Sequence, residues 1–142
     1  MGKKARIRPI SLCLLRRGEA ILVHESYDSV KQAGFARPLG GGIDFGETSA
    51  AAAMREIKEE LGADIAEVTL LGVVENLFVY EGEPGHELVF VYDGRFVDES
   101  LYGQERLTVV EGKRQFEAVW RSPAELRTGP YRLVPEELWG LL

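Results

Sequence analysis

The sequence predicts a mixed α/β fold, and three observations lead to this prediction. Short apolar segments separated by turn-forming residues recur along most of the chain, as is typical of strands. The segment 48–61 instead has its apolar residues at helical spacing. A final apolar segment, 135–142, is compatible with a second helix. Many strands with one strong central helix and one C-terminal helix indicate a mixed α/β domain.

The N-terminal part predicts two paired strands followed by a loop. Ile7–Leu15 is largely apolar, as expected of a buried strand, and Ala20–His24 is a shorter apolar segment. The residues Arg16–Glu19 between them favour a hairpin turn. Ser26–Gly34 is polar, and we expect it to be a loop. The three glycines at 40–42 then allow the backbone to approach another group closely or to adopt a positive φ.

A helix is predicted over Thr48–Leu61, because alanine is frequent there and apolar residues recur at helical spacing. Gly62 follows directly and is a natural C-terminal stop. The apolar positions of this helix are Ala50, Ala53, Met54, Ile57 and Leu61.

The rest of the chain predicts strands, with helical segments only near the C-terminus. Ser122 and Pro123 are residue types preferred at the N-cap and the first position of a helix, so a short helix is expected to begin there. The other predicted segments are one strand or two over Glu67–Tyr80, a turn over Glu81–Gly85, strands over His86–Phe96 and Phe116–Trp120, a loop over Val97–Gly112 with a short strand at Leu107–Val110, and a last helix over Pro135–Leu142.

Length and charge limit the possible functions. A chain of 142 residues has the size of one domain, and we expect a single domain over 1–142 because no repeat or linker interrupts it. The net charge of −6 argues against sequence-independent binding of nucleic-acid polymers, which requires a basic surface. The single cysteine, Cys13, lies in an apolar run and is expected to be a small buried residue.

No segment predicts export or membrane insertion. The apolar runs are far shorter than the ~20 residues of a membrane span, and the run after the basic N-terminus is broken by Arg16 and Arg17. A lone cysteine fits a reducing compartment. We therefore expect a cytoplasmic protein with no membrane partner.

Three glutamates of the predicted helix form the most informative pattern. Glu56, Glu59 and Glu60 are spaced i, i+3 and i+4, so their carboxylates share one side of the helix and repel one another. We expect at least one of them to have a raised pKa in the folded protein. Converging carboxylates behind a glycine-rich loop are typical of a site for a hard cation such as Mg²⁺. Similar runs also occur on solvated helix surfaces, and taken alone that alternative is favoured by about two to one.

A longer pattern weakens this alternative. The stretch 41–63 resembles the Nudix box, in which glycine, glutamate, an Arg-Glu pair, an aliphatic residue, two further glutamates and a glycine stand at fixed spacing. From the composition of this chain, a chance match at the seven Gly, Glu and Arg positions is on the order of 1 in 10,000 or rarer. Ala63 departs from the pattern, because a larger aliphatic residue is usual there, and we expect this to affect packing more than chemistry. The matching residues are Gly41, Glu47, Arg55, Glu56, Ile57, Glu59, Glu60 and Gly62.

The resemblance implies an α/β/α sandwich with a mixed sheet and a central catalytic loop and helix, and it implies roles for the box residues. Arg55 corresponds to an arginine that orients the carboxylates by ion pairing, and Glu47 to a glutamate that we expect to hold the loop before the helix. The implied metal ligands are the backbone carbonyl of Gly41 and the side chains of Glu56, Glu59 and Glu60.

The activity implied by the resemblance is metal-dependent cleavage of a pyrophosphate bond in a nucleoside diphosphate linked to another group. Carboxylates repel a diphosphate, so Mg²⁺ ions, or Mn²⁺ in their place, are needed to reverse the local field and to lower the pKa of a bound water. Glu59 is the first candidate for the base that accepts the proton of this water. The family also uses a glutamate from outside the box, for which Glu111 is the candidate, and an ordinary surface loop residue is an equally good interpretation of Glu111.

Several other residues have two interpretations. His24 and His86 are isolated in the sequence, which favours structural or surface roles over catalysis. Arg37 precedes the glycines and is either a contact to a substrate phosphate or a surface charge. Tyr80 has about the spacing from the box that a tyrosine has in the diadenosine-polyphosphate hydrolases of the family, which weakly indicates such substrates. The residues expected to dock the last helix or to contact a second copy of the chain are Leu138, Trp139, Leu141 and Leu142.

Two other functions compete with hydrolysis. A Nudix-like nucleotide-binding or sensor module would be expected to carry a degenerate box, whereas the carboxylates are complete here. A structural or interaction domain would carry the glutamates as a solvated surface and would bind Mg²⁺ negligibly. Oxidised nucleotides, dinucleoside polyphosphates, nucleotide sugars and capped RNA ends are all compatible substrates, because the residues that select among them vary across the family.

Overall fold

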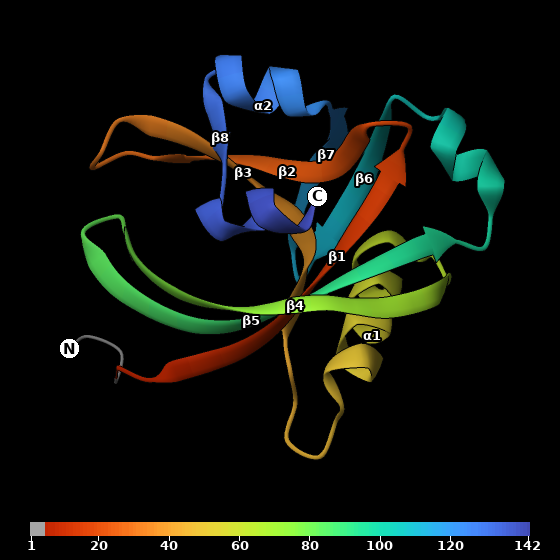
Figure 1. Ribbon diagram of the computed structural model, residues 1–142, viewed down its shortest axis with the longest axis horizontal. Coiled ribbons are helices and arrows are strands. Elements are labelled where there is room, and N and C mark those ends of the chain that lie inside the picture. Colours follow the sequence, from red (N-terminus) through yellow and green to blue (C-terminus); the bar gives the residue numbers. More distant parts are fainter. Residues whose placement is uncertain (1–4) are drawn as a thin grey trace.

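The computed structural model describes residues 5–142, which form a mixed arrangement of strands and helices (Figure 1). The strands are β1 (Ile7–Arg17), β2 (Ala20–Asp28), β3 (Ala33–Gly42), β4 (Ile65–Tyr80), β5 (Glu83–Phe96), β6 (Arg106–Glu111), β7 (Arg114–Arg121) and β8 (Tyr131–Leu133). The helices are α1 (Ser49–Leu61) and α2 (Pro123–Thr128), with 3₁₀ helices η1 (Glu99–Gly103) and η2 (Glu136–Leu141).

The strands form one mixed sheet in the order β4-β5-β1-β3-β2-β7-β6, with β8 beside β3. The pairs β1–β5 and β3–β8 are parallel, and the other pairs are antiparallel. Helix α1 lies on one side of this sheet, whereas α2 and η2 lie on the other (Figure 1). The predicted α/β/α sandwich with a mixed sheet is therefore confirmed.

Two hydrophobic clusters occupy the two sides of the sheet. Leu126 of α2 and Leu138 of η2 belong to the cluster on one side. Ile57 of α1 belongs to the other cluster, together with Cys13 and Ala63. Cys13 is 1% exposed, and burial raises the pKa of its thiol to about 12, so it is the buried small residue that the sequence predicts. Ala63 is also buried, as expected of a packing position.

Strand β3 connects the two halves of the sheet. Its first part pairs with β2 as far as Pro38, and Leu39–Cys13 is the first pair with β1. Over residues 40–42 the second edge of β3 has no strand partner within 5–142. The three glycines therefore lie at an open sheet edge, and α1 packs against it.

Two hairpins differ from the sequence prediction. A loop is predicted over Ser26–Gly34, but β2 continues to Asp28 and β3 begins at Ala33. This prediction is wrong because the hairpin tip is held by a distant part of the chain, where the Asp28 carboxylate accepts the backbone N–H of Glu81 at 3.2 Å. The turn between β4 and β5 is also shorter than the predicted 81–85, because β5 already begins at residue 83.

The C-terminal part is predicted correctly in outline. Ser122 caps α2 as expected, and its hydroxyl accepts the backbone N–H of Glu125 at 3.1 Å. The last segment is a 3₁₀ helix rather than an α-helix, and the three-residue strand β8 is too short to produce a sequence pattern. Leu138 is fully buried, and Trp139, Leu141 and Leu142 pack against the same cluster, so this segment docks on its own core.

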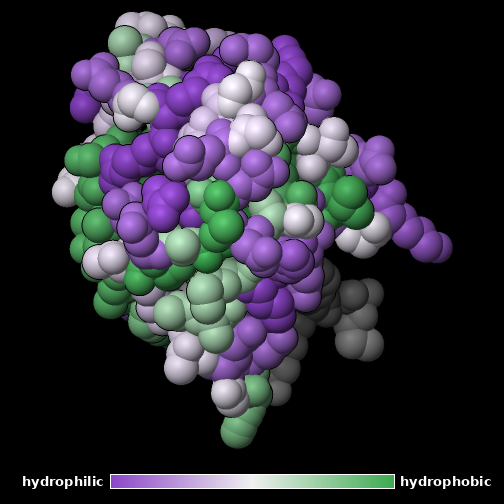
Figure 2. Space-filling model, turned by 90° about the vertical axis from the view of Figure 1, so that its right-hand side faces the viewer, coloured by the Kyte–Doolittle hydropathy of each residue, from purple (hydrophilic) through white to green (hydrophobic). Residues whose placement is uncertain are grey.

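Strand β4, at the edge of the sheet, carries several of the apolar side chains that remain exposed. Val73, Leu77 and Val79 alternate along this strand and are 52%, 71% and 46% exposed. Figure 2 shows hydrophobic side chains gathered along one margin of a surface that is otherwise mostly hydrophilic. No helix within residues 5–142 combines the length and the apolar composition of a membrane span.

Candidate active site

Helix α1 has the ends that the sequence predicts. The hydroxyl of Thr48 accepts the backbone N–H of Ala51 at 3.1 Å and so caps the N-terminus. Gly62 adopts a left-handed conformation with φ of 67° and donates its N–H to the carbonyl of Lys58 at 2.9 Å. Both ends are therefore satisfied by local hydrogen bonds.

The buried side of α1 is rotated relative to the predicted apolar stripe. Met54 is 44% exposed, whereas Glu60 is only 5% exposed. The helix thus turns a carboxylate rather than a thioether toward the sheet. Burying a carboxylate is unfavourable unless it has partners, so this orientation indicates a function for Glu60 beyond packing. The residues on the buried side are Ala52, Ala53, Ile57 and Glu60.

Glu56 and Glu60 face the glycines at the open edge of β3. A Cβ atom on Gly41 would lie 2.5 Å from the carboxyl carbon of Glu56, so a larger residue does not fit there. Glu60 accepts a hydrogen bond from the backbone of Gly40. Its Oε1 atom is buried and has no hydrogen-bond partner among residues 5–142. Gly41 is therefore needed to let the Glu56 carboxylate approach the backbone of β3.

Arg55 links the loop before α1 to the carboxylates. Its guanidinium donates to the Glu47 carboxylate twice, at 2.7 and 2.9 Å, and to the carbonyl of Gly42 at 2.9 Å. The same group lies 3.0 Å from Glu56 and 3.3 Å from Glu59. The hydrogen bonds from Arg55 lower the pKa of Glu47 to about 2. Glu47 thus holds the loop through Arg55.

The carboxylates share an unfavourable electrostatic environment. Burial is the main cause that raises the pKa of Glu60 to about 8, and the charges of Glu56, Glu111 and Glu59 add to it. Burial also raises the pKa of Glu56, against the opposing influence of Arg55. The predicted raised pKa is confirmed for both residues, but burial is a larger cause than the mutual repulsion that the spacing suggests.

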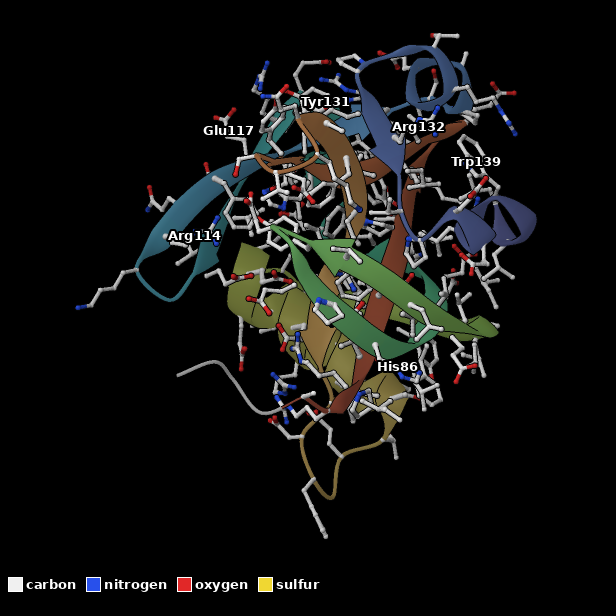
Figure 3. The ribbon with its side chains drawn as sticks, turned by 90° about the vertical axis from the view of Figure 1, so that its left-hand side faces the viewer. His86, Arg114, Glu117, Tyr131, Arg132 and Trp139 are labelled. Carbon is white, nitrogen blue, oxygen red and sulfur yellow. The ribbon has the colours of Figure 1, made fainter. Side chains whose placement is uncertain are left out.

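Glu111 is the last residue of β6 rather than a loop residue, so the predicted loop position is wrong. It pairs with Arg114 across the β6–β7 turn, and their charged groups are 4.0 Å apart. Figure 3 labels Arg114 on this hairpin. Its charge contributes to the raised pKa values of Glu56 and Glu60, so the fold brings Glu111 to the box carboxylates. The position of Glu111 is set by the β6–β7 hairpin. The residues of the box do not predict that this hairpin lies near them.

His24, which the sequence does not connect with the box, lies near Glu111. The ring of His24 packs against that of Phe116 at an interplanar angle of 34°, with ring centroids 3.9 Å apart. Burial lowers the pKa of His24, Arg114 lowers it further, and Glu111 opposes this. In the β2–β3 register His24 is the partner of Arg37. The sequence does not predict these neighbours of His24, because they depend on the pairing of β2 with both β3 and β7.

The β2–β3 and β4–β5 hairpins contact each other near their tips. Ser29 of the β2–β3 turn donates its backbone N–H to the carboxylate of Glu81 at 2.8 Å. Phe35 and Tyr80 meet in a T-shaped contact with centroids 5.7 Å apart. Tyr80 therefore contacts an aromatic side chain of β3, while His86 lies 3.3 Å from Glu75.

Within residues 5–142, no three His, Cys, Asp or Glu side chains form a group that could hold a metal ion as they stand. Arg55 holds both Glu56 and Glu59 in ion pairs. Two observations favour a cation at this position: the unpartnered Oε1 of buried Glu60, and the close fit of Gly41 against Glu56. The residues that could hold the metal are the Gly41 carbonyl, Glu56, Glu59, Glu60 and Glu111.

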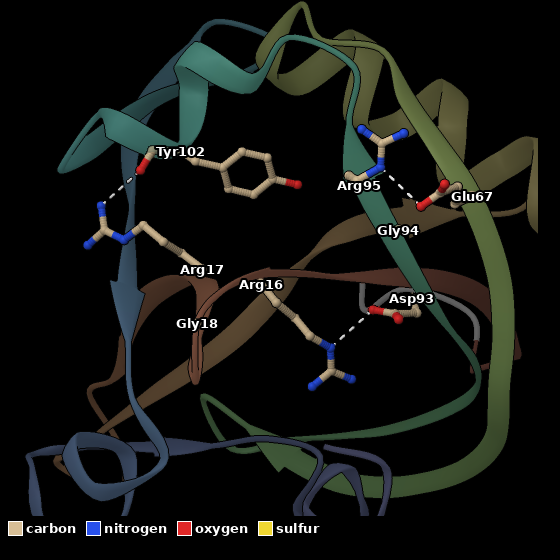
Figure 4. A pocket seen from close by; sticks show the side chains of 8 residues that line it. All are labelled: Arg16, Arg17, Gly18, Glu67, Asp93, Gly94, Arg95 and Tyr102. Atoms are coloured by element: carbon tan, nitrogen blue, oxygen red, sulfur yellow. Dashed lines mark hydrogen bonds and ion pairs between the residues drawn. The ribbon is translucent and has the colours of Figure 1, made fainter.

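Two hollows of the surface lie away from the box carboxylates. One, of about 470 Å³, is lined by charged residues that include the pairs Arg16–Asp93 at 3.1 Å and Arg95–Glu67 at 3.0 Å (Figure 4). Along β1, Arg16 is five residues beyond Ser11, the partner of Gly41, which is about 17 Å at 3.3 Å per residue. None of the box glutamates lines this hollow or a second one of about 380 Å³. The carboxylates, rather than the hollows, mark the site.

A glycine edge, a helix with clustered carboxylates and an arginine that ties them to the preceding loop define a hydrolase of the type suggested by the box. The NUDIX domain matches residues 6–138, so this chain belongs to the NUDIX family and is a Nudix hydrolase. Such hydrolases act on small nucleotide-like substrates by cleaving pyrophosphate-type bonds, and they generally use divalent metal ions.

Solved structures agree with this assignment. A MutT NUDIX hydrolase from Burkholderia pseudomallei is 27% identical, with 96% of each chain covered and a TM-score of 0.68. A NUDIX hydrolase from Nitrosomonas europaea is 19% identical, over 89% of this chain and 81% of that one, with a TM-score of 0.62. An ADP compounds hydrolase is 21% identical, over 87% of this chain and 63% of that one, with a TM-score of 0.55. The last two, at such low identity, show the fold alone.

Proposed function

We propose that this chain hydrolyses the pyrophosphate bond of a nucleoside diphosphate linked to another group, with Mg²⁺ held by the Gly41 carbonyl, Glu56, Glu59 and Glu60. The observation that carries this proposal is the buried Glu60 carboxylate, whose Oε1 atom has no partner among residues 5–142. It lies beside a second carboxylate that only a glycine neighbour accommodates. A bound cation would satisfy both groups.

When bound, Mg²⁺ supplies charge neutralisation at the phosphoryl oxygens and a lower pKa for a coordinated water. Glu59 is the proposed general base, because its side chain is 59% exposed and can reach a water. Among residues 5–142 its side chain hydrogen-bonds only to Arg55. Arg55 is a positioning residue, because it holds Glu56, Glu59 and the loop through Glu47.

Glu111 is proposed as an additional ligand from outside the box. Its influence on the pKa of both Glu56 and Glu60 supports a position at the same site. Its only charged partner within the described chain is Arg114, at the 4.0 Å limit of an ion pair, and its side chain is 57% exposed. The carboxylate is therefore available to a cation without the loss of a strong contact.

The proposed substrate class is supported by the net charge and by the names of two structural neighbours. A net charge of −6 favours a small substrate over a nucleic-acid polymer. Two neighbours are an ADP compounds hydrolase and a UDP-X diphosphatase, and their names describe nucleoside diphosphates linked to another group. The complete set of carboxylates favours hydrolysis over a sensor role.

The test is a product assay with a panel of nucleotide sugars, dinucleoside polyphosphates and nucleoside triphosphates, each with Mg²⁺, Mn²⁺ or EDTA. We expect metal-dependent release of a nucleoside monophosphate or its phosphorylated partner from at least one class. Glu60→Gln should remove this activity, whereas Glu117→Gln, on the β6–β7 hairpin and 52% exposed, should retain it. Turnover that persists in EDTA would overturn the proposal.

A further inference from the structure

The outer edge of β4 is open over residues 72–80, which we call the edge segment. Strand β4 stands at one end of the strand order and has no neighbour on its outer side within residues 5–142. It pairs only with β5, and over the edge segment this pairing has no register shift. No other backbone hydrogen bond in the described part of the chain involves these residues. Alternate backbone N–H and C=O groups therefore point outward and need water or another chain as partner.

The edge segment lacks the features that usually prevent an edge strand from pairing. Exposed edges in monomeric proteins commonly carry lysine, proline, several charges or a bulge. The edge segment contains no Lys, Arg or Pro, and Glu75 is its only charged residue. The strand at the other end of the sheet, β6, is shorter and has a charged residue at each end, Arg106 and Glu111. Of these two edges, that of β4 is therefore the one suited to pairing.

One face of the edge segment also carries exposed apolar side chains. Val73, Leu77 and Val79 are 52%, 71% and 46% exposed and share this face, because they are separated by even numbers of residues. Val73 is the register partner of Phe90, and Phe90 is that of Ser11. Since Ser11 donates a hydrogen bond of 2.7 Å to the first residue of α1, these side chains lie on the same side of the sheet as α1.

The edge segment is complementary to a second copy of itself. In an antiparallel pair about a two-fold axis perpendicular to the sheet, residues that stand opposite each other lie on the same face. Full overlap of the two segments puts Asn76 on the axis. Val73 then lies opposite Val79 of the second copy, and Glu75 lies opposite Leu77 of the second copy. Apolar side chains meet each other, and the only charge of the segment does not face its own copy.

We propose that the chain forms a two-fold dimer in which the edge segments of two copies pair antiparallel and continue the sheet from one copy into the other. A second copy fits this edge because the pairing matches both the apolar side chains and the single charge. The surface differs from the C-terminal segment around Trp139, which packs on the core of its own chain. Because the axis is perpendicular to the sheet, the α1 helices of the two copies lie on the same side of the continuous sheet.

Sedimentation equilibrium of the full chain tests the proposed register through the sign of a charge. Leu77→Glu should weaken association about tenfold or more, because each new carboxylate faces Glu75 of the second copy. Leu77→Lys removes the same apolar side chain but brings the opposite charge to Glu75, so it should preserve or strengthen association. Leu77→Glu combined with Glu75→Lys should restore the dimer. Val97→Glu is the matched control, because Val97 is 58% exposed and lies outside the edge segment.

Hydrogen exchange provides a readout of the backbone pairing. Alternate amides of the edge segment should exchange rapidly in dilute wild-type protein and become protected as its concentration rises, whereas exchange in β6 should not depend on concentration. Leu77 is largely exposed, so its variants should keep the Tm of the wild-type monomer. Equal weakening by Leu77→Glu and Leu77→Lys would overturn the inference. A wild-type monomer at every concentration would also overturn it and would leave the edge to an extended segment of another protein.

Discussion

The carboxylate of Glu47 and the guanidinium of Arg55 form a bidentate ion pair with N–O distances of 2.7 and 2.9 Å. The pair connects a loop residue with the second turn of α1, and the same guanidinium reaches Glu56 and Glu59. The loop and the carboxylates therefore move together. Disturbing either member of the pair changes the arrangement of the proposed ligands without removing one.

Replacing Glu47 with Gln should make the protein less sensitive to acid and less active. The pKa of Glu47 is lowered to about 2, so its ionised form stabilises the fold above its ordinary pKa of 4.5. This stabilisation is lost as the pH falls from about 4.5 to 2. The difference in Tm between wild type and Glu47→Gln should be largest above pH 5 and should shrink toward pH 2, and kcat should fall about tenfold or more. A constant Tm difference over this range would contradict the assignment.

Glu60→Gln should stabilise the metal-free protein at alkaline pH and abolish turnover. The pKa of Glu60 is raised from 4.5 to about 8, so its contribution to stability is fully present below pH 4.5 and is lost as the pH rises through about 8. In EDTA, the Tm of the wild type should fall between pH 6 and 9 more than that of the variant. The Tm of Glu117→Gln under the same conditions should follow that of the wild type. An identical change of Tm with pH in all three proteins would contradict a raised pKa for Glu60.

Mg²⁺ should stabilise the folded protein, because the proposed ligands come together only there. At ten times its Kd, a ligand that binds only the native state adds about 1.4 kcal/mol to the free energy of unfolding. The activity should disappear in EDTA and return with Mg²⁺ or Mn²⁺, and its rate should rise between about pH 7 and 9 as the bound water deprotonates. Thermal melts and pH–rate profiles check both points. An optimum near pH 5 would indicate carboxylic-acid catalysis without metal.

Glu111→Gln should lower kcat by about 10² with little change in Tm, because the side chain is exposed and weakly paired but contributes to the proposed site. Glu105→Gln is a matched control, since Glu105 is 86% exposed and lies just before the same hairpin. A wild-type rate for Glu111→Gln would return Glu111 to an ordinary surface role.

Gly41→Ala should reduce kcat by about 10² even though alanine is compatible with a strand. The added Cβ would lie 2.5 Å from the carboxyl carbon of Glu56 and would displace this proposed ligand. Gly103→Ala serves as the control, because its Cβ would meet no atom within 4 Å. Comparable losses in the two variants would show that the effect is not specific to the carboxylate site.

The sequence alone predicted the elements that depend on residues close together in the chain. The C-terminal end of α1 followed from Gly62, because this cap is a local hydrogen bond. The β2–β3 hairpin was missed because its polar residues extend two strands whose pairing is supported by contacts from residue 81. A polar segment can form a strand when a distant part of the chain stabilises it, and a sequence window does not contain that information.

The sequence by itself determined the family, the helix and the identity of the box carboxylates, because fixed spacing on one helix places them on one side of it. Only the tertiary structure decided that Glu60 is buried and Glu59 exposed, since this depends on how α1 is rotated against the glycine edge of β3. It also decided that the charge of Glu111 lies near Glu56 and Glu60. These contacts depend on strand order and register, which are set by packing between segments far apart in the chain.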